Sequence, residues 1–169
     1  MSYLTVLPLA DVKTYLRIDD TQNETDAEIT SMINSAFRYI ERVTNILVYD
    51  RSKEYIVNNR CVYVYDYPVN SVTKGIDEDG ADVALVFKTD YDLDEKHGYK
   101  VYYNIDGDAV KLVLNVGYTV ASDVPEDLIE VAKIMVKVMY YEQETNQSFK
   151  ELLPHWAKEY LDTNRRFIF

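Results

Sequence analysis

The hydrophobic residues of this 169-residue chain change their spacing twice, and this change constrains the fold more than any other sequence feature. Up to residue 45, and again after residue 124, apolar residues recur every three or four positions, which is typical of amphipathic helices. From about residue 53 to residue 118 they alternate with polar residues, which is typical of strands. The order helix, strand, helix predicts two helical blocks separated by an inserted sheet.

Two helices are predicted in the first block. A short one runs from Pro8 to Leu16, and the polar segment 17–21 ends it. A longer one opens at Thr25, which is spaced to form a capping box with Glu28, and it ends near Asn45. Its apolar stripe consists of Ile29, Met32, Ile33, Ala36, Phe37, Ile40 and Val43.

The middle of the chain predicts short antiparallel strands. Residues 61–65 alternate, so that Val62 and Val64 share one face. Residues 110–116 also alternate: Val110, Leu112, Leu114 and Val116 share a face, and Lys111, Val113 and Asn115 point away. Turn signals separate the runs at Asn58-Asn59, Asp79-Gly80, Lys96-His97-Gly98 and Asp106-Gly107-Asp108. Runs of this length and punctuation favour hairpins.

The second helical block opens at Val124-Pro125, because proline suits the first turn of a helix. This helix is apolar on most sides, so we expect its own core and a neighbouring subunit to cover it. Ser148 and Glu151 are spaced as another capping box, and Pro154 restarts the last helix.

We therefore predict an α+β fold: a helical bundle, in which N-terminal and C-terminal helices pack together, with an inserted antiparallel β-sheet subdomain. The predicted boundaries assign residues 1–52 and 121–163 to the helical core, 53–120 to the sheet subdomain and 164–169 to a C-terminal tail.

Few residues could support catalysis. His97 stands in a predicted turn and His155 in a predicted helix, where a lone histidine is more often a surface or packing residue. No nucleophile elbow, Walker loop or zinc spacing is present. Cys61 is the only cysteine, which excludes an intrachain disulfide and a multi-cysteine metal site. We predict no catalytic residue, no metal, no cofactor and no enzymatic activity.

Acidic residues dominate the charge, which is −11 overall, and ten of them stand against three lysines between residues 76 and 108. Two clusters resemble calcium loops but fail the EF-hand pattern, because Gly75 and Val86 would occupy the first and last positions of one, and Val101 the last position of the other. We interpret them as solvated turns. The acidic band is defined as Asp77, Glu78, Asp79, Asp82, Asp90, Asp92, Asp94 and Glu95.

This charge limits the partners. A protein that grips nucleic acid needs clustered lysine and arginine, so DNA should be repelled. No apolar run approaches the roughly 20 residues needed to span a bilayer, and no secretory signal is visible, so we expect no membrane partner and synthesis in a cytoplasm. The 16 tyrosines, many in the predicted sheet, favour either strand packing or subunit contacts. Stacking on single-stranded nucleic acid would require a basic groove.

Four weak motifs, in order, resemble tailed-phage head–tail connector (adaptor) proteins, in the version with a sheet insertion. Residues 9–19 resemble their opening pattern L-x-x-x-K-x-x-L-R-[IV]-D, and residues 26–44 the helix pattern that follows it. Tyr67-Pro68 before Asp79-Gly80, then Val116-Gly117-Tyr118, match the insertion. Val124-Pro125 opens a late apolar helix that ends in Tyr141-Glu142, where Arg-Glu is usual in the family.

The resemblance implies a structural protein of the virion neck, at the head–tail junction, which forms a ring of commonly twelve identical subunits. The ring would dock under the portal, extend the DNA channel and meet a downstream tail or stopper protein, while DNA passes without sequence-specific binding. If the acidic band faced this channel it would keep DNA from adhering; if it faced outward it would only aid solubility. Two alternatives remain open: another neck protein, such as a stopper or tail-completion protein, or a small acidic binding module or enzyme.

In similar adaptors the C-terminal segment inserts into the portal, which suggests a portal-docking role for Arg165, Arg166, Phe167, Ile168 and Phe169. Burying two phenylalanines and an isoleucine stabilises by roughly 5–9 kcal/mol. Ordering five residues costs about 1–2 kcal/mol each, so one tail would bind marginally. A ring of tails would bind through avidity. The alternative is a frayed terminus.

Overall fold

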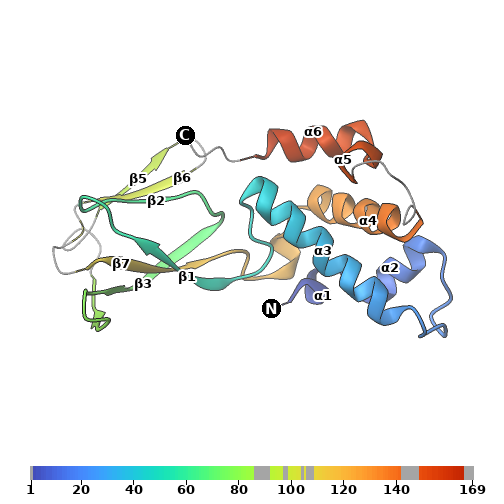
Figure 1. Ribbon diagram of the computed structural model, residues 1–169, viewed down its shortest axis with the longest axis horizontal. Coiled ribbons are helices and arrows are strands. Elements are labelled where there is room, and N and C mark those ends of the chain that lie inside the picture. Colours follow the sequence, from blue (N-terminus) through green and yellow to red (C-terminus); the bar gives the residue numbers. More distant parts are fainter. Residues whose placement is uncertain are drawn as a thin grey trace. The chain divides into compact units, whose positions relative to one another are not determined.

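The computed structural model describes residues 2–85, 92–96, 99–103, 105, 109–141 and 149–165 (Figure 1). The chain divides into two compact units. The helical unit consists of residues 1–44 and 118–165, and the sheet unit contains residues 45–117. The sheet unit is thus inserted between two helical segments, and the predicted α+β class is confirmed.

The N-terminal part of the helical unit holds three helices: α1 (Tyr3–Val6), α2 (Leu9–Leu16) and α3 (Asp26–Thr44). The stripe predicted for the long helix forms its buried face, with Ile29, Ile33 and Phe37 fully buried. Asn45 follows the last helical residue with a φ of 57°, so it ends the helix as predicted. The capping box predicted for Thr25 and Glu28 is not formed. The Thr25 hydroxyl is buried and has no hydrogen-bond partner among the described residues.

The C-terminal part holds the 3₁₀ turn η1 (Ala121–Asp123) and the helices α4 (Glu126–Tyr141), α5 (Phe149–Leu152) and α6 (His155–Thr163). The apolar face of α4 packs on α3, and α6 packs on α3 as well. Leu128, Val131 and Val136 of α4 are inaccessible to solvent. The two helical segments therefore pack together as predicted, since each supplies the cover for the apolar stripe of the other.

Two antiparallel sheets make up the sheet unit. One has the strand order β1-β7-β3-β4, and the other the order β2-β6-β5. The strands are β1 (Arg51–Ile56), β2 (Val62–Val64), β3 (Val69–Ile76), β4 (Asp82–Val83), β5 (Asp92–Lys96), β6 (Tyr99–Tyr103) and β7 (Lys111–Val116). The central strand β7 pairs Leu114 with Lys53 of β1 and with Val72 of β3.

An apolar cluster forms the core of the described part of the sheet unit. The alternation predicted from sequence is confirmed, because Leu112, Leu114 and Val116 of β7 are all fully buried. Val62 and Val64 of β2 join the same cluster, so both sheets contribute to it. Val113, predicted to point away from this face, is nevertheless only 7% exposed.

The turns follow the chemistry of their residues. Asn59 and Arg60 both have positive φ angles, of 51° and 62°, as a type I′ turn between β1 and β2 requires. Gly80 has a φ of 85° in the turn between β3 and β4. Two other predicted turns, at residues 97–98 and 106–108, lie outside the described residues. None of the described helices is long and apolar enough to cross a membrane.

Candidate functional site

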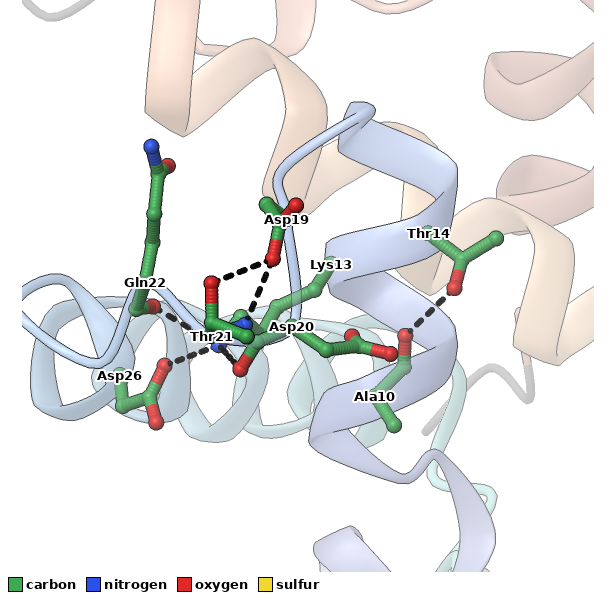
Figure 2. Close-up of polar contacts among 8 residues, drawn as sticks. All are labelled: Ala10, Lys13, Thr14, Asp19, Asp20, Thr21, Gln22 and Asp26. Carbon is green, nitrogen blue, oxygen red and sulfur yellow. Dashed lines mark hydrogen bonds and ion pairs between the residues drawn. The ribbon is translucent and has the colours of Figure 1, made fainter.

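Helix α2 and the start of the loop that follows it carry the connector-like motif, and the buried Lys13 of α2 holds the loop (Figure 2). Lys13 is only 3% exposed. Its ammonium donates hydrogen bonds to the carbonyl oxygens of Asp20 (3.1 Å) and Gln22 (2.8 Å). It also lies 2.9 Å from Oδ1 of Asp26, at the start of α3. A buried ammonium requires full pairing, so these three oxygens make Lys13 the anchor of the whole loop.

The remaining motif residues shape the same loop. Arg17 ends α2 in the left-handed conformation, with a φ of 61°. Asp19 Oδ1 accepts hydrogen bonds from the Thr21 hydroxyl (2.6 Å) and the Thr21 backbone N–H (2.8 Å). These bonds lower the pKa of the Asp19 carboxyl, the side-chain bond contributing most. The loop is therefore an exposed polar segment that its own hydrogen bonds hold in place.

The structure divides the predicted acidic band between the two sheets. Asp77, Glu78 and Asp79 form the turn after β3, and Asp82 opens β4. The other described members lie in β5 of the second sheet: Asp92, Asp94 and Glu95. Asp90 lies outside the described residues.

Two of the turn acids are engaged within the sheet unit. Asp77 Oδ1 accepts hydrogen bonds from the backbone N–H groups of Asp79 (3.0 Å) and Ala81 (2.7 Å). Asp82 forms an ion pair with Lys74 at 2.5 Å. Glu78 and Asp79 are exposed and present their charge to solvent. Among the described residues, no group of acidic, histidine or cysteine side chains could hold a metal ion.

The proposed tail can be followed only at its first residue. Arg165, just after α6, is exposed. Arg166, Phe167, Ile168 and Phe169 lie outside the described residues, as does His97. His155 is exposed at the start of α6. Cys61, the residue before β2, is a half-buried free cysteine.

Two tyrosines of the sheet unit contribute to its packing. Tyr102 is buried in the apolar cluster, and Tyr55 packs against it. The Tyr55 hydroxyl donates a hydrogen bond to Asp66, which Lys53 also contacts at 2.9 Å. Burial, with the bond to Asp66, raises the pKa of Tyr55 above its ordinary value. Tyr63, by contrast, is 54% exposed.

Comparisons with known proteins give a family match and a shared fold. A family model described as "Head completion protein" matches residues 5–152. No curated protein matches the chain. Three solved structures share the fold at 18% sequence identity, each covering 98% of this chain.

The three structures come from gene transfer agent particles. In the neck of an empty particle, computed with C6 symmetry, the matching chain gives a TM-score of 0.73 over 92% of its length. In the virion of the native particle the TM-score is 0.70 over 91%. In the neck of the native particle, computed with C12 symmetry, it is 0.68 over 91%.

Proposed function

The chain belongs to the head completion protein family, which confirms the resemblance to head–tail connector proteins. We propose that it is a structural, non-enzymatic subunit of the virion neck, and that its copies form a ring beneath the portal. The match to the family model over residues 5–152 carries this proposal. The fold likeness to neck proteins from particles computed with C6 and C12 symmetry supports a ring of identical subunits, of which twelve is the expected number.

The proposed partners follow from this position. The ring contacts the portal above, a downstream tail or stopper protein below, and identical subunits on either side. DNA passes through its channel without sequence-specific binding. The net charge of −11 supports this last point, because a surface of that sign repels phosphates.

The purified chain mixed with its own portal tests the ring. We expect electron micrographs to show added ring density below the portal, and light scattering to show the corresponding increase in mass. The variant lacking residues 165–169 tests the proposed tail in the same experiment. We expect it to bind the portal about 100-fold or more weakly, because a ring of tails acts through avidity.

Thr163→Ala is the matched control for the tail, since Thr163 is exposed just before it and the substitution leaves the tail intact. A full chain that stays solitary in the presence of portal would overturn the proposed function. A ring that forms equally well without residues 165–169 would remove the tail from the proposal and leave the ring in place.

The acidic band is proposed to line the channel and to prevent DNA from adhering. Glu78→Lys combined with Asp79→Lys reverses the two exposed charges of the β3–β4 turn. We expect this variant ring to retain linear duplex DNA at low salt, and to release it as salt rises, because cations would then contact phosphates. Filter binding measures the retention.

A control of equal charge separates position from net charge. Asp11→Lys combined with Glu159→Lys makes the same charge change at exposed positions of the helical unit. Only the turn variant should retain DNA. Equal retention by both variants would show that the turn has no special place in the channel.

A further inference from the structure

The helical unit contains an apolar groove that the proposed function leaves unassigned. It has a volume of about 310 Å³. Its lining residues come from α2, from the last two turns of α4, and from α5 and the residue before α6: Tyr15, Ile134, Lys137, Val138, Tyr141, Leu152 and Pro154. This volume lies at the low end of the range for small-ligand pockets, roughly 300–1,000 Å³, and suits one or two inserted side chains.

The walls of the groove are held in place. The Tyr141 hydroxyl donates a hydrogen bond to the carbonyl oxygen of Leu16, at 2.9 Å, and so ties the end of α4 to the end of α2. Tyr141 is nevertheless 57% exposed, and Tyr15 is 37% exposed. The Tyr141 ring is thus fixed at the rim, and much of the surface of both tyrosines stays uncovered, which is typical of a protein contact surface.

One cation stands at this rim. Lys137 is exposed, with its ammonium 6.0 Å from the centre of the Tyr15 ring. In the described part of the chain no carboxylate lies within ion-pair distance of it, whereas its neighbour Lys133 pairs with Glu130 at 2.6 Å. An occupant that fits the groove therefore combines an apolar side chain with a carboxylate.

The turn before α4 offers this combination. Val120 is 51% exposed, and Asp123 is exposed three residues later. The Asp123 backbone N–H donates to the Val120 carbonyl oxygen (3.1 Å), which closes the 3₁₀ turn, and the buried Val124 anchors it. The apolar side chain and the carboxylate are thus presented one turn apart on a fixed backbone.

The turn directly precedes α4, whereas the groove is lined by the second half of α4, within the same unit. Lys137 lies fourteen positions after Asp123, and at about 1.5 Å per helical residue this places the two roughly 20 Å apart, so the turn cannot enter the groove of its own chain. Complementary surfaces at two ends of one rigid body join copies head to tail, and such contacts form a ring when the rotation from one copy to the next closes.

We propose that the Val120–Asp123 turn of one subunit inserts into the α2–α4–α5 groove of the next, with Asp123 paired to Lys137. This inference rests on the proposed ring and identifies the surface that builds it. A ring of such contacts would cover the exposed rings of Tyr15 and Tyr141 in every copy.

A charge exchange tests the pairing, with the full-length chain and its portal. Asp123→Lys alone and Lys137→Asp alone should each weaken portal-templated ring assembly roughly fivefold or more, because each places like charges together. The double exchange should restore assembly. Circular dichroism on each variant checks that it is folded. Full assembly by both single variants, or no rescue by the double variant, would overturn the pairing.

Cross-linking provides a second measurement. In a Cys61→Ser background, Val120→Cys combined with Val138→Cys should give a ladder of disulfide-linked multimers when the ring forms, because a disulfide requires close approach of the two Cβ atoms. Ser35→Cys combined with Val138→Cys, with an exposed position on α3, should give none. A ring without the ladder would refute this contact and leave the proposed function standing. Absence of any ring from the unmodified chain would refute both.

Discussion

Gly117→Ala is expected to lower the free energy of unfolding of the sheet unit by about 4 kcal/mol or more, from backbone strain and overpacking together. Gly117 is buried, with a φ of 107°. A Cβ atom there would lie 2.1 Å from the Tyr49 carbonyl oxygen and 2.6 Å from the carbonyl carbon. These are backbone atoms, which cannot move aside as the end of a flexible side chain would.

The surroundings prevent Gly117 itself from moving. Its N–H donates to the Pro68 carbonyl oxygen at 2.7 Å, and its carbonyl accepts from the Asn70 side chain at 2.7 Å. The preceding residue, Val116, pairs with Arg51 at the start of β1. A shift that relieved the clash would therefore break the first pair of the β1–β7 ladder.

Gly80→Ala is the matched control. Gly80 also has a positive φ, of 85°, but no atom lies within 4 Å of the position a Cβ would take. Gly80→Ala should lower the free energy of unfolding by only about 1–2 kcal/mol, the cost of placing alanine in the left-handed conformation. Urea unfolding followed by circular dichroism measures both variants. Equal losses at the two positions would show that close approach to Tyr49 is not what requires glycine.

Lys13→Met is expected to destabilise the helical unit by about 2–4 kcal/mol. The substitution retains the apolar stem and removes the ammonium, leaving Asp26 and the carbonyls of Asp20 and Gln22 without their shared partner. Loss of one member of a buried ion pair costs about 3–5 kcal/mol. The lower range applies here because the Asp26 side chain is 30% exposed and regains water.

Amide hydrogen exchange should locate the effect. We expect faster exchange in the loop between α2 and α3, with the thermal unfolding temperature reduced. Thr14→Ala is the control one position along the same helix, since the exposed Thr14 hydroxyl donates a hydrogen bond to the Ala10 carbonyl oxygen of α2 itself (Figure 2). Its effect should stay within about 0.5 kcal/mol. A Lys13→Met protein as stable as the Thr14→Ala protein would contradict the anchoring role.

These contacts explain why particular residue types occur in the connector-like motifs. The lysine of the first motif, Lys13, holds the loop that the arginine and aspartate of the same motif, Arg17 and Asp19, shape. The glycine of the Val116-Gly117-Tyr118 motif allows the close approach to Tyr49. Neither role could be predicted from sequence. The role of Lys13 depends on the conformation of a loop that has no periodic pattern, and the role of Gly117 depends on atoms of Tyr49, which is distant along the chain.

The candidate surfaces were predictable only in part. The apolar surface of α4 predicted that a neighbouring subunit, in addition to its own core, covers this helix. Part of that surface lines the groove. The groove itself required Tyr15 and Tyr141, 126 positions apart, to meet at the ends of two helices. The acidic band was visible as composition, but its division between two sheets was not, because strand order is set by long-range pairing.

Local physics determined the elements of this protein from the sequence by itself. A helix needs a repeated apolar stripe and a stop such as Asn45, and a strand needs alternation, and both signals are contained within about ten consecutive residues. Tertiary structure alone decided which sheet each strand joined, why Lys13 is buried and why position 117 must be glycine. These outcomes depend on the packing of distant segments, where a contact of a few ångströms outweighs any local preference.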